Sequence, residues 1–390
     1  MISIQEKKDC SGCSACASIC GHECIYMGTD EEGFLYPEVD ASKCISCGLC
    51  ERVCPIINVP KHNEISQVIA AKSNDELSRF KSSSGGVFRL LAEEVLSAGG
   101  VVVGCRFNEH MEAVHAVAHS MAELEGLMSS KYVQSATRGI FEEVRGILRQ
   151  GTVVLFSGVP CQVAALKNFL MKNYDNLMTV DILCHGVPSP KFFKDYLGSL
   201  ERRYNGEIES LSFRWKEKSW KRLYINAAFN NKKRHFLYSG YDSYMQLFLS
   251  DRLQRPSCFH CPYNTLNRPG DISLGDFWGI GKKYYDFDDN RGVSMVLINN
   301  EKGQEIWDRV AKQTEFIETD IQTAVAGNQV LVRHLPSSQK RDEFYGEYIK
   351  NGFSSAIEKF APEVSKPSQL YQNFMRWGLD IVRKIKRESY

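Results

Sequence analysis

Short apolar runs alternate with amphipathic stretches through the middle of the chain. Apolar runs bounded by glycine or polar residues are typical of buried strands, and apolar residues at every third or fourth position are typical of helices. Strands that alternate with helices indicate an α/β domain with a mixed sheet. The pattern predicts strands at 67–72, 101–107, 152–158, 177–186 and 293–299, and helices at 87–100, 136–151, 160–173, 189–204 and 301–312.

Other segments suggest how the chain divides. Residues 61–66, KHNEIS, are typical of a polar linker, and residues 207–240 have a β-like, basic pattern. The stripe of apolar residues after Ser368 predicts a helix packed on its own protein or on a neighbouring subunit, with an interfacial membrane helix as the alternative. We therefore predict three parts: 1–60, 61–345, and a helical C-terminal extension at 346–390.

Composition narrows the class of protein. The chain has 390 residues, of which 43% are hydrophobic and 24% charged, and a formal net charge of +1. This charge gives no sign of a nucleic-acid partner. We find no secretory signal and no transmembrane segment, so we expect a cytoplasmic protein. Fourteen cysteines in a reducing compartment indicate metal ligation more than disulfides.

Eight of these cysteines stand in two runs within the first 54 residues. Both runs have the spacing C-x2-C-x2-C-x3-C, as in bacterial ferredoxins, where three thiolates hold one 4Fe–4S cluster and the fourth reaches the other cluster. Zinc is the alternative, although its sites typically use two separated pairs. The crossed assignment gives one cluster Cys10, Cys13, Cys16 and Cys54, and the other Cys44, Cys47, Cys50 and Cys20.

The first 60 residues have further features of an electron-carrying module. Gly12 and Gly48 suit the unusual backbone angles of loops that wrap a cluster. Gly21 stands where proline usually follows the first run, and Cys24 fits neither run, so we expect Cys24 to be a buried apolar residue. Nine acidic and four basic side chains give this segment a net charge of −5. Such a module transfers electrons and transforms no substrate by itself.

The sequence SSSGGVF (82–88) lies between a predicted strand and a predicted helix. Backbone N–H groups at a helix N-terminus attract phosphate through hydrogen bonds and the helix dipole. An ordinary Ser-Gly turn with an N-cap is the alternative interpretation. The dinucleotide-binding sequence G-x-G-x-x-G is not found after any predicted strand.

Five cysteines lie beyond the two runs and Cys24. Cys105 lies inside an apolar strand and is interpreted as core. The others stand beside glycine, proline or histidine at strand or loop ends, and four thiolates are what a third cubane requires. Zinc, or four unconnected cysteines, are the alternatives. These four residues are Cys161, Cys184, Cys258 and Cys261.

Six short motifs, in this order, resemble one family. They are SSSGGVF, SKYVQS (130–135), SGVPCQVAAL (157–166), LCHGVPSPKFF (183–193), SFRWK (212–216) and CFHCPYNTLNRPGDISLGDFWG (258–279). The set is similar to the coenzyme F420-reducing hydrogenase/dehydrogenase beta subunit family, over roughly residues 67–345. The segments GDFWG and FRWKEKSW differ slightly from the sequences that are usual in the family. We therefore do not assign a substrate from the resemblance.

The resemblance implies an FAD domain with its own 4Fe–4S cluster, held by the four cysteines from Cys161 to Cys261. It implies electron transfer between iron–sulfur carriers and a hydride acceptor. Relatives include F420 hydrogenase and formate dehydrogenase beta subunits, and other members occur near cell-surface polysaccharide genes. The implied flavin-binding residues are Ser83, Ser84, Gly85, Gly86, Ser130, Lys131, Tyr132 and Gln134.

Hydride delivery usually needs a proton donor within hydrogen-bond reach. His185 and Lys131 are the candidates, and a structural role for His185 beside a cluster is the alternative. Between Ser212 and Phe236 eight basic residues accompany one glutamate. A solvated sheet face is the default interpretation of that stretch, and an anionic substrate site or a dock for an acidic ferredoxin is the alternative.

Three functions fit these observations. The first is a flavin reductase that takes electrons from ferredoxin, or another low-potential donor, and reduces a small-molecule substrate. The second is a beta subunit that works with a catalytic partner subunit and reduces F420 or NAD(P). The third is an iron–sulfur assembly or nucleic-acid-binding protein with structural clusters, which no other feature of the sequence favours.

Overall fold

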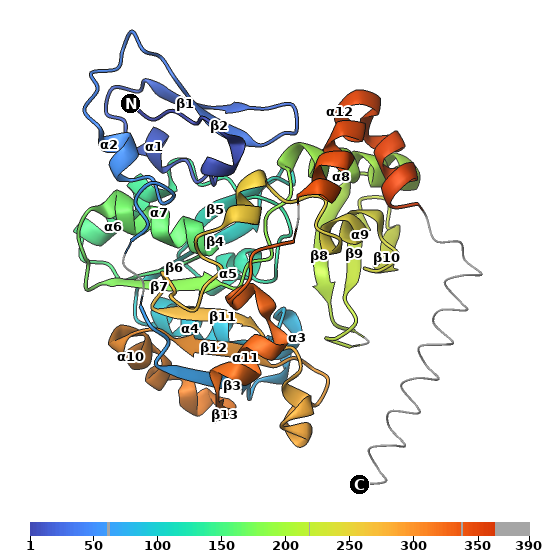
Figure 1. Cartoon of the computed structure of the whole chain (residues 1–390). Helices are drawn as coiled ribbons and strands as arrows, with labels where there is room; N and C mark the ends of the chain where they lie inside the picture. Colours follow the sequence, from blue (N-terminus) through green and yellow to red (C-terminus); the bar gives the residue numbers. More distant parts are fainter. Residues whose placement is uncertain (61–62, 218, 337, 363–390) are drawn as a thin grey trace.

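The computed structural model describes residues 1–60, 63–217, 219–336 and 338–362. Figure 1 shows a small N-terminal part, a large central sheet with helices on its two faces, and a smaller sheet beside α8 and α12. This mixed α/β architecture confirms the predicted fold class. The predicted tail helix after Ser368 lies outside the described residues.

The central sheet has eight strands in the order β13-β3-β12-β11-β7-β6-β4-β5. Pairs β4–β6, β6–β7 and β7–β11 are parallel, and the pairs nearer the two edges are antiparallel. The mixed sheet is as predicted. Its strands are β3 Gln67–Ser73, β4 Val101–Phe107, β5 Ala113–Ala118, β6 Val154–Gly158, β7 Leu177–Ile182, β11 Ile272–Asp276, β12 Ser294–Ile298 and β13 Thr314–Thr319.

Helices cover both faces of this sheet because successive strand side chains point to opposite sides. Val102 and Leu155 pack with α4 and α10 in one core, whereas Val103 and Phe156 pack with α6 and α7 in another. The helices here are α3 Glu76–Lys81, α4 Val87–Ser97, α5 Met121–Leu127, α6 Ile140–Arg149, α7 Pro160–Leu170, α10 Glu301–Val310 and α11 Ile321–Gly327.

The N-terminal part is a two-stranded antiparallel sheet with two single-turn helices. Its elements are η1 Lys7–Asp9, α1 Ala15–Ser18, β1 Ile25–Thr29, β2 Leu35–Val39 and α2 Leu49–Arg52. Gly12 has φ 69° and Gly48 has φ 75°, which confirms the backbone angles expected of them. Cys13, Ala15 and Val53 pack into the same core as α6 and α7.

A second sheet, in the order β10-β9-β8, packs against α8, α9 and α12. α12 also reaches the N-terminal part, because buried Arg341 forms an ion pair with Glu32. α12 begins before residue 346, where we predicted the extension to start, and is broken at Gly352. The elements are α8 Pro190–Tyr204, β8 Ile208–Trp215, β9 Tyr224–Phe229, β10 Arg234–Tyr238, α9 Ser243–Leu249 and α12 Gln339–Phe360.

Short 3-10 helices complete the described residues: η2 Pro256–His260, η3 Ile280–Lys282, η4 Tyr285–Phe287, η5 Ala311–Gln313 and η6 Gln329–Leu331. Within the described ranges, no helix is both long and apolar enough to cross a membrane.

Candidate cluster and cofactor sites

None of the fourteen cysteines forms a disulfide in the structure. Throughout the part of the chain that the structure describes, no three His, Cys, Asp or Glu side chains converge as ligands of one ion would. Most of the cysteines gather in three groups. We call them the distal site, the middle site and the inner site.

The distal site is a cavity of about 330 Å³ in the N-terminal part. Cys44, Cys47 and Cys50 line it, and so does Cys20 from the first run. The crossed assignment predicts this combination. The backbone N–H of Ile2 donates to Cys50 Sγ at 3.3 Å. Four thiols around such a space fit the four corners of one 4Fe–4S cluster.

The middle site consists of Cys10, Cys13 and Cys16 with Cys54 from the second run. Burial raises the pKa of the Cys13 thiol to about 12, and the nearby Cys54 and Cys10 add to the rise. Burial also raises the pKa of Cys16, with further contributions from Cys13, Cys10 and Cys54. Cys16 and Cys54 pack in the same apolar cluster, and metal binding would displace the protons of such thiols.

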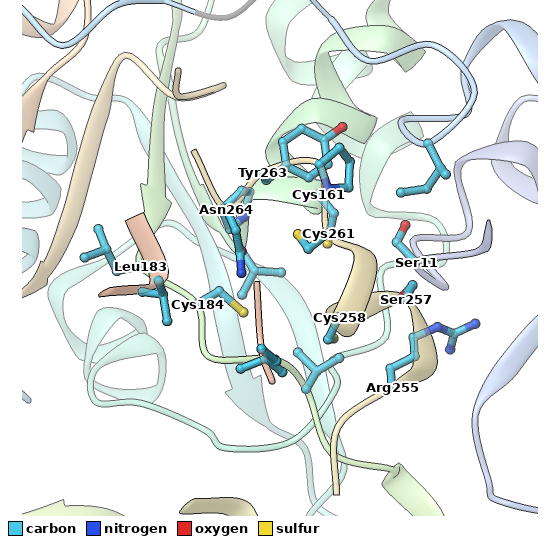
Figure 2. Close-up of a pocket in the computed structure, with 18 of the residues that line it drawn as sticks. Ser11, Cys161, Leu183, Cys184, Arg255, Ser257, Cys258, Cys261, Tyr263 and Asn264 are labelled. Atoms are coloured by element: carbon cyan, nitrogen blue, oxygen red, sulfur yellow. The ribbon is translucent and has the colours of Figure 1, made fainter. Parts of the chain in front are cut away.

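The inner site is a cavity of about 650 Å³ beside the ends of β6 and β7. Figure 2 shows Cys161, Cys184, Cys258 and Cys261 gathered around it. Cys161 is the second residue of α7, Cys184 follows β7, and Cys258 and Cys261 lie within and just after η2. Burial, followed by the neighbouring Cys261 thiol, raises the pKa of Cys258 to about 12. The fold thus brings together four thiols that are up to 100 positions apart in sequence.

The inner and middle sites are neighbours. The Cys161 thiol has its pKa raised by burial and by Cys13 of the middle site, as well as by the other three inner cysteines. Tyr263 lines the inner cavity, and its hydroxyl donates to the carbonyl of Pro55, next to Cys54, at 2.6 Å. One aromatic side chain therefore contacts both sites.

Arg255 also joins the two sites and is fully buried. Its guanidinium donates to the carbonyl of Cys10 at 2.6 Å, to that of Leu35 at 2.8 Å and to Gln134 Oε1 at 3.2 Å. Gln134 Nε2 in turn donates to the carbonyl of Ser11 at 3.1 Å. Gln134, which the resemblance assigned to the flavin, thus contacts the loop of the middle site.

The other predicted flavin-binding stretches meet around Arg214 of β8. The backbone N–H of Ser130 donates to Ser83 Oγ at 3.0 Å. Arg214 donates to the carbonyl of Ser83 at 2.9 Å and to the hydroxyl of Tyr132 at 3.2 Å. Gly86, with φ 96°, begins α4. Residues 83–86 and 130–132, which are far apart in sequence, therefore form one surface.

Buried cations surround this surface. Arg214 pairs with Asp276 at 2.6 Å, yet its Nε has no hydrogen-bond partner among the described residues. Lys216 Nζ donates to the carbonyls of Arg79, Ser84 and Arg291, so its three N–H groups are all used. Burial, reinforced by the charges of Arg214 and Arg79, lowers the pKa of Lys216 to about 7. The unsatisfied Arg214 donor beside this loop fits a bound anion.

The default interpretation of residues 212–236 as a solvated sheet face is wrong for Arg214 and Lys216, which are 5% and 7% exposed. A signal was present in the sequence. Arg214 and Lys216 alternate with the aromatic Phe213 and Trp215. Residues two positions apart in a strand lie on one face, so Arg214 and Lys216 are expected on the same face. That face is covered by the loop at 82–86.

Comparison with known protein families matches two parts of the chain. Residues 9–57 match the 4Fe-4S dicluster domain, and residues 151–324 match the model for the C terminus of the beta subunit of coenzyme F420 hydrogenase/dehydrogenase. Residues 151–324 are thus similar to the C-terminal region of an oxidoreductase subunit family. The matched iron–sulfur domain precedes this region in the same chain.

One solved relative is a chain of the F420-reducing NiFe hydrogenase complex from Methanosarcina barkeri, in a xenon derivative. It is 17% identical with a TM-score of 0.46, over 77% of this chain and 92% of that chain. No curated protein matches the chain.

Two candidate proton donors lie within or beside the beta subunit region. Lys131 Nζ donates to the carbonyls of Gly126, Met128 and Ser129 at 2.9, 2.6 and 3.1 Å, and burial lowers its pKa to about 8. These hydrogen bonds tie the Lys131 side chain to the loop that precedes it, so Lys131 has a structural role there. His185 is exposed, with its ring centroid 6.4 Å from that of Phe248. Both catalytic roles stay predictions.

Proposed function

We propose that the protein is an iron–sulfur flavoprotein oxidoreductase. It takes electrons from ferredoxin or another low-potential donor, passes them through 4Fe–4S clusters to FAD, and delivers them as hydride to an organic substrate or coenzyme. Residues 1–60 would hold two clusters, residues 61–345 would hold a third cluster and FAD, and residues 346–390 would form a helical extension.

The observation that carries this proposal is the grouping of twelve cysteines into three sets of four, two of which are in contact through Tyr263. Cys20 and the second run would hold the distal cluster, and Cys54 and the first run the middle cluster. Cys161, Cys184, Cys258 and Cys261 would hold the inner one. Because the inner set lies beside the middle set, this order gives single electrons a continuous route inward.

The residues around Arg214 fit the phosphate groups of FAD. The buried Arg214 Nε has no partner among the residues described, and the start of α4 at Gly86 lies beside the same loop. Buried donors without partners cost free energy, about 1–3 kcal/mol each, which an anionic ligand would recover. When bound, a flavin accepts electrons singly and releases them in pairs.

A second candidate is an electron-transfer subunit that works with a catalytic partner. The match to a beta subunit model favours it. The contacts between the N-terminal part and the central sheet favour the self-contained reductase, because the electron entry and the beta subunit region then share one chain.

Anaerobic purification followed by metal and cofactor analysis tests the proposal. We expect about twelve iron atoms per chain, from three clusters of four, and one FAD released on acid denaturation. Arg214→Met should reduce bound flavin and leave iron unchanged, whereas Arg234→Met, at an exposed position of β10 in the same sheet, should leave both unchanged.

Protein with full iron and sulfide but no flavin, even after FAD is added, contradicts the proposal. Isolation of the chain from its host in a fixed ratio with a second, catalytic subunit would favour the subunit function instead.

A further inference from the structure

The distal site contains one thiol more than a cluster needs. Cys24 lines the same cavity as Cys20, Cys44, Cys47 and Cys50. It is 3% exposed, as expected of a buried residue, but its side chain faces the site. Cys24 Sγ lies 3.3 Å from Cys20 Sγ, close enough for a hydrogen bond between the two sulfurs.

A tight turn brings these two cysteines together. The backbone N–H of Glu23 donates to the carbonyl of Cys20 at 3.1 Å, and Glu23 has φ 48°. The chain therefore reverses between Cys20 and Cys24, and both side chains reach the cavity. Gly21, where proline is usual in such runs, has open space around it.

The two thiols are held by different elements. Cys20 follows α1 and its N–H donates to the carbonyl of Ala17 at 3.3 Å. Cys24 precedes β1, and its carbonyl accepts from the N–H of Asp40 at 2.8 Å, at the end of the β1–β2 ladder. The backbone of each cysteine is therefore anchored outside the turn that joins them.

We propose that Cys20 and Cys24 are interchangeable fourth ligands of the distal cluster, an inference that rests on the proposed function. Cys44, Cys47 and Cys50 supply three corners, and the last iron binds whichever of the two thiolates is nearer. The remaining cysteine stays protonated and donates its S–H to the bound sulfur, which is a recognised influence on cluster potential.

The exchange is balanced. The bond between iron and one cysteine sulfur breaks, the bond to the other sulfur forms, and the proton moves across the short sulfur–sulfur contact from the incoming to the outgoing cysteine. Neither sulfur nor iron changes oxidation state, so no external reagent is needed. The arrangement protects the most peripheral cluster, since loss of one ligand does not open a corner.

Four variants of the full chain, purified without oxygen, test this proposal: Cys20→Ala, Cys24→Ala, the double variant, and Cys47→Ala. Cys47 lines the same cavity, whereas the Cys24 thiol contacts Cys20. Cys47 is therefore the matched control for a ligand that Cys24 does not contact in this way. Iron content and the electron paramagnetic resonance signal of a 3Fe–4S cluster are measured. We expect both Cys20→Ala and Cys24→Ala to keep wild-type iron without a 3Fe–4S signal.

The double variant and Cys47→Ala should each lose about one iron per chain, or the whole distal cluster. If Cys20→Ala or Cys24→Ala alone behaves like Cys47→Ala, the exchange is refuted and the ligand is fixed. Thiol alkylation of the native protein, read by mass spectrometry, needs no variant. If the two ligands exchange, Cys20 and Cys24 should each be partly alkylated. If one of them is a fixed ligand, only the cysteine that does not bind the cluster should be alkylated. Wild-type protein without any N-terminal cluster would instead contradict the proposed function.

Discussion

Arg255→Met should loosen the N-terminal part from the central sheet. Arg255 is fully buried and is the hydrogen-bond donor to Cys10, Leu35 and Gln134. Its guanidinium carbon also lies 4.1 Å from the ring centroid of Tyr36. Methionine keeps much of the volume but removes every donor.

The magnitude follows from the three acceptors that remain buried. Each lost bond to a charged donor costs about 1–3 kcal/mol when the acceptor stays unsatisfied. Allowing for partial hydration, the free energy of opening the N-terminal part should fall by about 3–6 kcal/mol. Since 1.4 kcal/mol is a factor of ten, opening should become about 10²- to 10⁴-fold more frequent.

Hydrogen exchange read by mass spectrometry measures this opening peptide by peptide in the holoprotein. Exchange in β1 and β2 should accelerate by that factor, with little change in β6 and β7. Arg149→Met, at an exposed position at the end of α6, is the control and should change neither. If β1 and β2 of Arg255→Met exchange at the wild-type rate, the reasoning is refuted. Equal acceleration in every strand would show global destabilisation instead of weaker packing of the N-terminal part on the central sheet.

Three further changes have defined outcomes. Cys161→Ser should lower iron by about four per chain if the inner site holds a 4Fe–4S cluster, and unchanged iron would remove that assignment. Burial lowers the pKa of Lys216 to about 7, against about 10.4 in an unfolded chain, so the unfolded chain binds more protons between these values. The free energy of unfolding should therefore rise between about pH 7 and pH 10, by up to about 1.4 kcal/mol per pH unit, in wild type but not in Lys216→Met. Chemical denaturation across this range measures the rise, and an equal rise in both proteins would contradict it. Glu32→Gln removes the buried carboxylate that pairs with Arg341, although Arg341 keeps its ion pair with Asp342, and should lower the free energy of unfolding by about 1–3 kcal/mol; an unchanged chemical denaturation midpoint would contradict this.

Much of the fold follows from local pattern. The apolar runs of β4, β6 and β7, and the glycine pair after α4, locate these elements because strand and helix periodicities are local properties. The order of the sheet does not follow in this way. β3 pairs with β12 and β13, more than 200 positions away, and only the burial of side chains along the whole sheet selects those partners.

The candidate sites also have features that local sequence predicts and features that only tertiary contacts determine. Cysteine spacing predicts the distal and middle sets, because their ligands lie within one short segment. The burial of Arg214 and the turn of Gln134 toward Ser11 depend on tertiary contacts. Residue type suggested a solvent-facing strand for Arg214, and the family resemblance suggested a flavin contact for Gln134. Lys131 was found as a candidate donor, but three backbone carbonyls around its ammonium are not visible in sequence.

The spread of the inner cysteines along the chain has a consequence for biosynthesis. Ligands for both peripheral clusters are all present once residue 54 has left the ribosome, whereas the inner cavity is incomplete until Cys261 emerges. If all three sites hold clusters, metal could enter the two N-terminal sites early, whereas the inner site could be filled only after Cys261 has emerged. A chain truncated before Cys258 would acquire the first cofactors and still lack the last.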